Sequence, residues 1–150
     1  MPLFTGTYEY SIDDKGRLSI PARHRDQVAK EEQDAVFFVT KIHPHCLSAY
    51  PPNEFQELVQ NVSQTNDPNV RDLMRQLTSG AVECPVDQQG RIALPAELRA
   101  QAGLKRDVVV LGVAKRLEIW DRAAYRQQAG QALESGAAAY AAIKAPSDLV

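Results

Sequence analysis

Residues 10–25 read YSIDDKGRLSIPARHR, and residues 84–99, which lie 74 positions later, read CPVDQQGRIALPAELR. A repeat of this kind determines the architecture of a chain more than any single element does. Six aligned pairs are identical: Asp13/Asp87, Gly16/Gly90, Arg17/Arg91, Pro21/Pro95, Ala22/Ala96 and Arg25/Arg99. The match continues between residues 36–41 and 110–115, and resumes beyond a loop that is four residues longer in the first copy. The chain therefore consists of two similar units.

Each copy is predicted to form two strands joined by a tight turn, then a short helix and two further strands. In the first copy, residues 8–12 and 18–20 alternate between apolar and polar side chains, as half-buried strands do. The Asp-x-x-Gly segment between them supplies a glycine, which takes a positive φ at little cost, and predicts a hairpin. Pro21 suits the first turn of a helix. The helices are predicted over 22–30 and 96–102, and the buried strands over 36–39 and 108–111.

Two amphipathic helices are predicted between the copies, over 53–64 and 69–79, because apolar residues recur there at helical spacing. We interpret their apolar faces as core, with subunit contact as the alternative. The predicted domains are repeat 1 over 7–53, a helical connector over 54–79, repeat 2 over 80–123, and a C-terminal helix and tail over 124–150. A repeat of about 45 residues cannot bury a core alone, so the two copies pack on each other or on copies in another subunit.

The composition is that of an ordinary globular protein and excludes two functional classes. Of 150 residues, 17 are Lys or Arg and 19 are Asp or Glu, which gives a net charge of −2. This balance excludes a polybasic protein that binds nucleic acid through bulk charge. The lack of an apolar run of about 20 residues excludes a membrane-spanning protein. No secretory signal pattern begins the sequence, so we expect a cytosolic protein whose two cysteines are reduced.

The repeated Asp-x-x-x-Arg motif is the candidate functional feature. At a turn, an Asp carboxylate accepts hydrogen bonds from nearby backbone N–H groups, and a Gly leaves room for another backbone or a ligand. The arginine of each motif either forms a salt bridge or binds a ligand. We assign a turn-shaping role to Asp13, Gly16, Asp87 and Gly90.

Basic residues are distributed unevenly between the copies. The first copy has a run without acidic residues: Lys15, Arg17, Arg23, His24 and Arg25. The matching part of the second copy has only Arg91 and Arg99, with Glu97 between them. Such a patch is usually a solvated face. On a β-ribbon, however, an exposed Arg beside Gly can present its fork to guanine O6 and N7 in a major groove, while other cations pair with phosphates. We therefore expect function to reside in the first copy.

On these motifs, residues 1–125 resemble the MraZ family of bacterial transcriptional regulators, and more distantly the AbrB/SpoVT swapped-hairpin DNA-binding family. The resemblance rests on SIDDKGRLSIPAR at 11–23, VDQQGRI at 86–92 and LEIWD at 117–121. It implies an α+β, mainly β fold: a pseudo-two-fold barrel of two swapped-hairpin repeats with peripheral helices, assembled into homo-oligomeric rings. It also implies a repressor of the division and cell-wall gene cluster, cytoplasmic and nucleoid-associated, that binds direct repeats in double-stranded DNA upstream of its own operon.

Carried over by position, the resemblance assigns DNA contact mainly to the first motif. The expected DNA-binding residues are Lys15, Arg17, Arg23 and Arg25, the last two as phosphate-backbone contacts. In the second motif, glutamines occupy the positions of Asp14 and Lys15, so Arg91 and Arg99 are secondary candidates. A net charge of −2 disfavours DNA binding by one subunit. A ring that inserts one turn per subunit into successive repeats compensates, because avidity can exceed single-site affinity by roughly 10²–10⁴.

Other functions fit the sequence less well. Asp13 and Asp87 lack the small residues that follow the carboxylates of an aspartic protease, and each has an Arg that keeps it ionised. His43, His45 and Cys46, with Cys84, do not match the spacing of a structural zinc site. Nucleophile-elbow and phosphate-loop motifs are absent from the sequence. We therefore expect no enzyme activity, metal, cofactor or membrane partner. The remaining alternative is an oligomeric scaffold that binds protein partners through the same hairpins.

Overall fold

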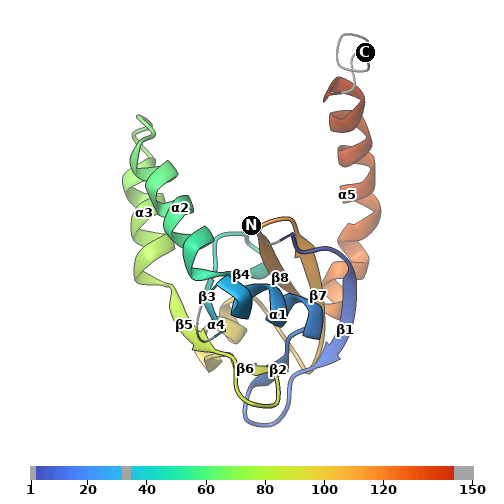
Figure 1. Cartoon of the computed structure of the whole chain (residues 1–150). Coiled ribbons are helices and arrows are strands. Elements are labelled where there is room, and N and C mark those ends of the chain that lie inside the picture. Colours follow the sequence, from blue (N-terminus) through green and yellow to red (C-terminus); the bar gives the residue numbers. More distant parts are fainter. Residues whose placement is uncertain (1–2, 32–34, 144–150) are drawn as a thin grey trace.

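Each copy folds in the predicted order of elements. The computed structural model describes residues 3–31 and 35–143. The first copy contains β1 (Thr7–Ser11), β2 (Arg17–Ser19), α1 (Ala22–Glu31), β3 (Val36–Thr40) and β4 (Cys46–Tyr50). The second contains β5 (Val82–Pro85), β6 (Arg91–Ala93), α4 (Ala96–Gln101), β7 (Asp107–Val113) and β8 (Arg116–Asp121). Figure 1 shows these strands gathered into one body, from which the remaining helices project.

The strands pair mainly between the two copies. A six-stranded antiparallel sheet has the order β1-β7-β8-β4-β3-β5, and β2 pairs with β6 in a separate two-stranded ribbon. Within the large sheet, three ladders join different copies: β1 with β7, β3 with β5, and β4 with β8. All of these ladders form within one chain. The two copies therefore pack on each other, which was the first of the two expected arrangements.

The predicted hairpins are wrong in their strand pairing. A tight turn does join β1 to β2, and the Asp13 N–H donates to the Arg17 carbonyl at 3.0 Å. The two strands then diverge, because β1 pairs with β7 and β2 pairs with β6. This exchange sets Leu18 opposite Ile92, and both side chains are fully buried. Burial of apolar side chains from both copies stabilises the exchange, whereas an isolated two-stranded hairpin is only marginally stable.

The large sheet is open. β1 and β5 form its edges, and no ladder joins these two strands in the described part of the chain. The structure is α+β, with a mostly antiparallel sheet and five helices among residues 3–31 and 35–143. The α+β class is therefore confirmed, whereas the expectation of a mainly β fold is wrong, because more of the described residues lie in helices than in strands. The expected barrel is not found, because the sheet does not close. None of the described helices is both long and apolar enough to cross a membrane.

One core joins the two copies and fixes the helices that follow the turns. Its buried apolar side chains come from both halves of the chain and include Phe4, Leu18, Val28, Phe37, Val39, Leu47, Ile92, Leu98, Val108, Val110, Leu117 and Ile119. Val28 belongs to α1 and Leu98 to α4. Because both helices are anchored in the same core, the turns that precede them are held in fixed relative positions.

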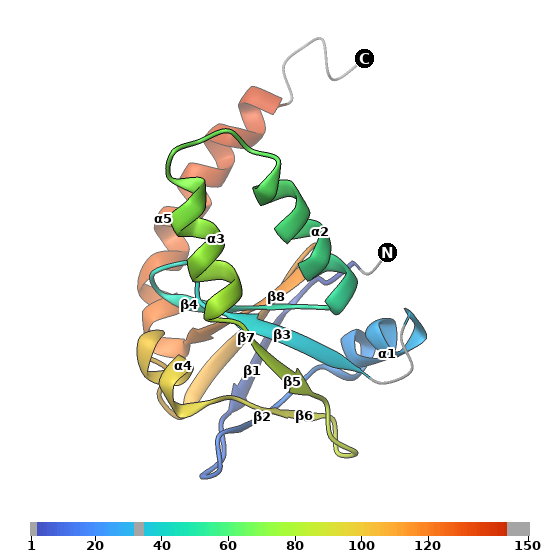
Figure 2. The same ribbon diagram turned by 90° about the vertical axis from the view of Figure 1, so that its left-hand side faces the viewer.

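Three helices project from the core. Figures 1 and 2 show α2 (Pro52–Ser63) and α3 (Val70–Ser79) as a helical hairpin on one side and α5 (Arg122–Ile143) on the other. Phe55 of α2 stacks on Phe38 of β3, with ring centroids 4.9 Å apart. Only Leu77 among the apolar residues of α2 and α3 is buried. The interpretation of their apolar faces as core is therefore wrong, because the hairpin packs on the body only near its base. Residues 144–150 of the predicted tail lie outside the described residues.

Candidate nucleic-acid interface

The first Asp-x-x-x-Arg motif forms a turn around the carboxylate of Asp13. Its Oδ1 accepts hydrogen bonds from the backbone N–H groups of Lys15 and Arg17, both at 2.9 Å. Its Oδ2 accepts a hydrogen bond from Nε of Arg17 at 2.7 Å. Gly16 has a φ of +78°, a conformation that residues with a Cβ rarely adopt. The carboxylate therefore organises both the turn and the arginine side chain.

The second motif repeats this geometry around Asp87. Its Oδ1 accepts hydrogen bonds from the N–H groups of Gln89 and Arg91, both at 2.9 Å. Its Oδ2 accepts one from Nε of Arg91 at 3.1 Å, and Gly90 has a φ of +80°. The two turns are therefore equivalent in backbone and differ in the side chains that they present.

Hydrogen bonds within the turns keep both carboxylates ionised. In the first turn, the backbone N–H of Arg17 has the largest effect and holds the pKa of Asp13 below its ordinary value of 3.8. The backbone N–H of Arg91 lowers the pKa of Asp87 in the same way. A protease carboxylate pair that shares one proton requires one pKa to be raised. The two carboxylates are therefore structural anions and do not resemble an acid–base pair.

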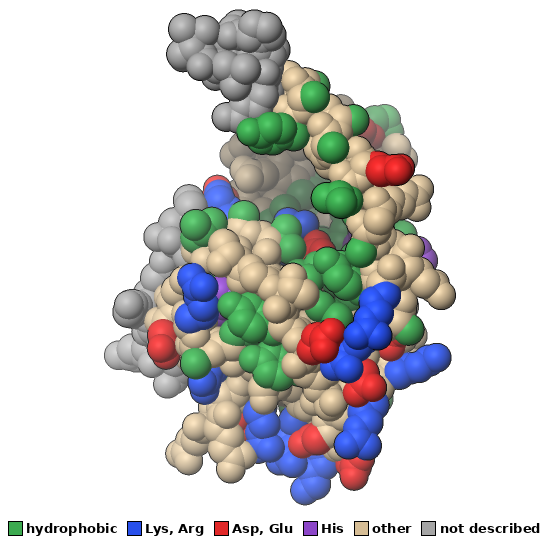
Figure 3. All heavy atoms as spheres, turned by 90° about the vertical axis from the view of Figure 1, so that its right-hand side faces the viewer, with side chains coloured by type: hydrophobic (Ala, Val, Ile, Leu, Met, Phe, Trp, Pro, Cys, Tyr) green, Lys and Arg blue, Asp and Glu red, His purple; other side chains and the backbone are tan. Residues whose placement is uncertain are grey.

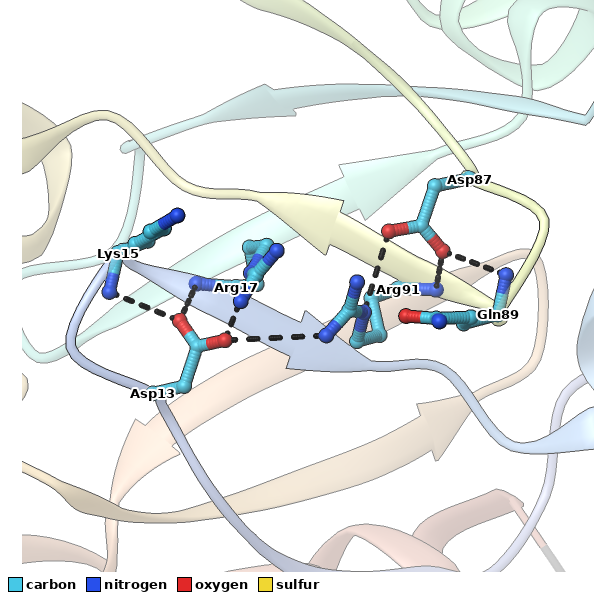
Figure 4. A network of polar contacts seen from close by, with 6 residues as sticks. All are labelled: Asp13, Lys15, Arg17, Asp87, Gln89 and Arg91. Carbon is cyan, nitrogen blue, oxygen red and sulfur yellow. Dashed lines mark hydrogen bonds and ion pairs between the residues drawn. The ribbon is translucent and has the colours of Figure 1, made fainter.

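The β2–β6 ribbon joins the two turns into one unit, as Figure 4 shows. Backbone hydrogen bonds of 2.9 Å run from each copy to the glycine of the other: Ile20 N–H to the Gly90 carbonyl, and Leu94 N–H to the Gly16 carbonyl. Across the ribbon, Nη1 of Arg91 lies 3.8 Å from Oδ2 of Asp13. The two turns are therefore in direct contact across the ribbon.

An arginine from the helix of the opposite copy covers each turn glycine. A Cβ placed on Gly90 would lie 1.8 Å from Nη1 of Arg25, and one placed on Gly16 would lie 3.0 Å from Nη2 of Arg99. Nε of Arg99 also donates to the Leu94 carbonyl at 3.1 Å. Nε of Arg25 is buried and has no hydrogen-bond partner among the described residues. Arg25, an expected DNA-binding residue, and Arg99, a secondary candidate, thus pack against the turns.

Among the basic residues of the two motifs and of the helices that follow them, those without an ion pair in the described residues lie mainly in the first copy. Lys15 and Arg23 are exposed and form no ion pair within residues 3–31 and 35–143. Arg17 is 34% exposed, and because Asp13 holds its Nε, its terminal Nη atoms have no partner in the same residues. Arg91 is only 25% exposed, and its Nη1 faces Asp13. The structure therefore brings Lys15 and Arg23 to the surface without an ion pair among the described residues, and Arg17 with its Nε paired to Asp13.

The sequence pattern did not identify a basic pair beside the first turn. The Ile12 N–H donates to the Arg106 carbonyl at 2.8 Å, so Lys105 and Arg106 flank the point at which the chain enters the turn. The available signal was two adjacent cations directly before a strongly apolar strand. That signal becomes informative only once β1 is known to pair with β7.

The residues considered for a metal site do not assemble into one. No group of three or more His, Cys, Asp or Glu side chains suited to a metal ion occurs in the described part of the chain. The ring of His43 packs instead against Trp120, with centroids 5.1 Å apart. Burial raises the pKa of the Cys46 thiol to about 12 and that of Cys84 to about 11. Both thiols are therefore protonated at neutral pH, whereas a metal ligand must be a thiolate.

Comparison with known proteins gives matches over nearly the whole chain. Residues 3–75 and 77–144 match the family model described as "MraZ protein, putative antitoxin-like". A protein of Limosilactobacillus fermentum named Transcriptional regulator MraZ is 41% identical over 143 residues, which cover 92% of this chain and 96% of the relative. Proteins with the same name come from Desulfitobacterium hafniense, 40% identical over 91% of this chain and 94% of the relative, and from Mycobacterium ulcerans, 42% identical over 83% and 85%.

Proposed function

Since the chain belongs to the MraZ family, we propose that it is a transcriptional regulator that binds double-stranded DNA through its first Asp-x-x-x-Arg turn. The observation that carries this proposal is the state of Arg17. Asp13 holds its Nε at 2.7 Å, and its Nη atoms have no partner among the described residues, on a side chain that is 34% exposed directly after the turn. A guanidinium fixed in this way can donate two parallel hydrogen bonds to guanine O6 and N7 without first losing side-chain freedom.

The neighbouring cations have different proposed roles. Lys15 and Arg23, which are exposed and unpaired among the described residues, contact phosphates on either side of the base that Arg17 reads. Arg25 and Arg99 lie against Gly90 and Gly16, so we assign them mainly to holding the turns in place. Arg91 is a secondary contact, because its Nη1 already faces Asp13.

An oligomeric ring is the second part of the proposal. It is supported by α5, whose 22 residues include none that is buried and which exposes Leu133 and Ile143. A second copy that covers this helix would explain why both apolar side chains are exposed in the single chain. Several first turns would then face successive direct repeats upstream of the protein's own operon, and each additional contact would be intramolecular. Occupation of that DNA would repress transcription of the division and cell-wall genes.

The proposed fold and location follow from the same evidence. We propose that the inter-copy strand pairs belong to swapped-hairpin repeats related by a pseudo-two-fold axis, since β1 pairs with β7 and β5 with β3. A protein that binds chromosomal promoter DNA resides in the cytoplasm, at the nucleoid.

The proposal is tested by measuring fluorescence anisotropy of labelled upstream DNA with Arg17→Ala and Arg91→Ala. Loss of the Arg17 fork should cost about 1–3 kcal/mol and relax sequence preference at one base. Arg91→Ala is the matched control and should have the smaller effect. Size-exclusion chromatography must show that both variants keep the wild-type assembly.

Two results would contradict the proposal. If wild-type protein does not bind its upstream DNA at any salt concentration, the alternative of a scaffold for protein partners is favoured. If Arg91→Ala abolishes binding and Arg17→Ala does not, the second turn is the working face.

A further inference from the structure

A basic pocket lies between the α4–β7 connection and the start of α5. Its volume is about 310 Å³. We call this cavity the basic pocket because four cationic side chains line it: Lys105, Arg106, Arg122 and Arg126. Two carboxylates, Asp107 and Asp121, also line it. None of these residues belongs to the Asp-x-x-x-Arg motifs.

The carboxylates of the pocket accept hydrogen bonds from groups other than its cationic side chains. Asp121 is buried, and its two oxygens accept hydrogen bonds from the backbone N–H groups of Lys105 (3.2 Å) and Ala124 (3.3 Å). Oδ1 of Asp107 accepts a hydrogen bond from the Ser11 hydroxyl at 3.1 Å. Neither carboxylate forms an ion pair with a cation of the pocket in the described part of the chain.

The cations of the pocket are correspondingly short of partners. Lys105, Arg106 and Arg122 form no ion pair with any described residue. Nη2 of Arg122 donates to the Tyr10 carbonyl at 3.3 Å, and its Nε is buried without a partner among the described residues. Among the four cations only Arg126 forms an ion pair with a described residue, with Glu9 at 3.4 Å, and both of these side chains are well exposed. The pocket therefore carries a net positive charge, because its four cationic side chains outnumber the two carboxylates that line it and Glu9.

The basic pocket is continuous with the first turn. The Ile12 N–H bonds to the Arg106 carbonyl, and Ser11 lies opposite Asp107 in the β1–β7 ladder. Figure 3 shows Lys and Arg side chains, with some acidic ones among them, running from the tip of the molecule up this face to the base of α5. A phosphate backbone that passes the first turn would meet this surface next.

The sequence at the position that corresponds to Lys105 and Arg106 in the first copy contains no basic pair. Its equivalent hydrogen bond runs from the Val86 N–H to the Ala35 carbonyl at 2.9 Å. In the sequence, the residues that precede Ala35 are Glu31, Glu32, Gln33 and Asp34, whereas Lys105 and Arg106 precede Asp107. The charge difference between the two turns therefore extends beyond the motifs.

We propose that the basic pocket binds the phosphate backbone of the same DNA duplex that the first turn reads. This inference rests on the proposed function. Arg and Lys bind phosphate oxygens through charge-assisted hydrogen bonds, and each phosphate that they neutralise releases condensed counterions. The pocket contributes affinity and orientation without sequence preference, while Arg17 supplies the base contact.

The test compares two double variants that each remove two positive charges. Lys105→Gln/Arg106→Gln alters the basic pocket and leaves the backbone bond from Lys105 to Asp121 possible. Arg71→Gln/Arg75→Gln is the matched control on α3, which Figure 1 shows at the opposite end from the turns. Anisotropy titrations use the upstream duplex and a scrambled duplex of equal length, at several salt concentrations. Circular dichroism melting verifies that both variants fold.

The pocket variant should bind both duplexes roughly tenfold or more weakly, and the slope of log affinity against log salt should decrease by about 2. The control variant and the charge-preserving Lys105→Arg/Arg106→Lys should bind as wild type does. If the pocket variant keeps the wild-type affinity and slope, the inference is wrong and the proposed function stands. If the control weakens binding equally, the effect is one of total charge and the pocket is excluded. If wild type binds neither duplex, the proposed function itself fails.

Discussion

At the residue scale, the two turns depend on the space that their glycines leave for an arginine of the opposite copy. Gly90 has a φ of +80°, and the guanidinium of Arg25 occupies the position of its missing side chain. Gly103 has a similar φ of +66°, but a Cβ placed there meets no atom within 4 Å. Substitutions at Gly90 and at Gly103 can therefore be compared, because both include the free-energy cost of the backbone conformation and only the first includes the cost of displacing the arginine.

We predict that Gly90→Ala destabilises the protein more than Gly103→Ala does. A positive φ costs a residue with a Cβ about 1–2 kcal/mol, and this cost applies to both variants. Gly90→Ala must in addition expel Arg25 from its position. Free energies of unfolding in urea should therefore show that Arg25→Ala reduces the cost of Gly90→Ala and leaves the cost of Gly103→Ala unchanged. Equal costs in the two backgrounds would show that Arg25 does not hold this turn.

His24 is a second residue whose surroundings make a measurable prediction. The ring is fully buried beside Phe4 and Tyr8, and its Nε2 lies 2.9 Å from the Thr5 carbonyl. Nδ1 has no partner among the described residues. Burial lowers the pKa of His24 below 6.5, although the hydrogen bond to Thr5 opposes this shift. The folded protein therefore holds the imidazole neutral, and protonation would add a buried N–H without an acceptor.

Stability should consequently fall as the pH drops below about 6.5. In that range the unfolded chain binds a proton that the folded chain does not, so the free energy of unfolding decreases towards acid and is unaffected above the unfolded pKa. Urea midpoints between pH 8 and pH 5 should show this slope in wild type and not in His24→Phe. His45→Ala, at an exposed position, should keep the wild-type slope. Asp13 and Asp87 do not contribute to this slope, because their pKa values in the folded chain lie below the ordinary value of 3.8 and the carboxylates stay ionised between pH 8 and pH 5. A His24→Phe protein with an unchanged slope would contradict the assignment.

At the element scale, local signals in the sequence predicted which elements form and in what order. Alternation of apolar residues identified β1 and β2, the glycine of each motif identified the turn, and the proline identified the start of α4. These features act within a few residues, where sterics and side-chain periodicity decide the conformation. The role of Asp13 in its own turn was predictable for the same reason.

Strand partners and long-range neighbours were not predictable in this way. Leu18 has the same buried alternation whether it pairs with β1 or with β6, so the pattern cannot tell a hairpin from an exchange. Arg25 lies over Gly90 only because the ribbon joins the two copies. The neighbourhood of Arg106 and Ile12 depends likewise on the β1–β7 ladder. The amphipathic spacing did identify α2 and α3 as helices. It does not reveal whether the surface that covers their apolar faces belongs to the same chain.

At the scale of the whole molecule, a net charge of −2 is combined with an end that presents cations without an ion pair among the described residues. Affinity for DNA then depends on how many such ends act together. One subunit can neutralise only a few phosphates, whereas linked subunits add contacts at a high effective concentration. In the proposed ring, the contact between subunits would therefore control DNA binding from a distance, and α5, which has no buried residue, is the element best placed for this role.

We predict that Leu133→Asp/Ile143→Asp disrupts the assembly and, through it, binding to repeated sites. The two side chains are 76% and 66% exposed in the single chain, so their replacement should leave its unfolding free energy nearly unchanged. Light scattering should show a particle mass that falls towards the 16.6 kDa of one chain. Affinity for DNA with several direct repeats should then fall by roughly 10²-fold or more, while affinity for a single repeat stays the same. Gln131→Asp/Ser135→Asp adds the same charge to exposed polar positions of the helix and should preserve the assembly. A dissociated protein that still binds several repeats as tightly as wild type would contradict the role of avidity, and an unchanged particle mass would exclude α5 as the contact.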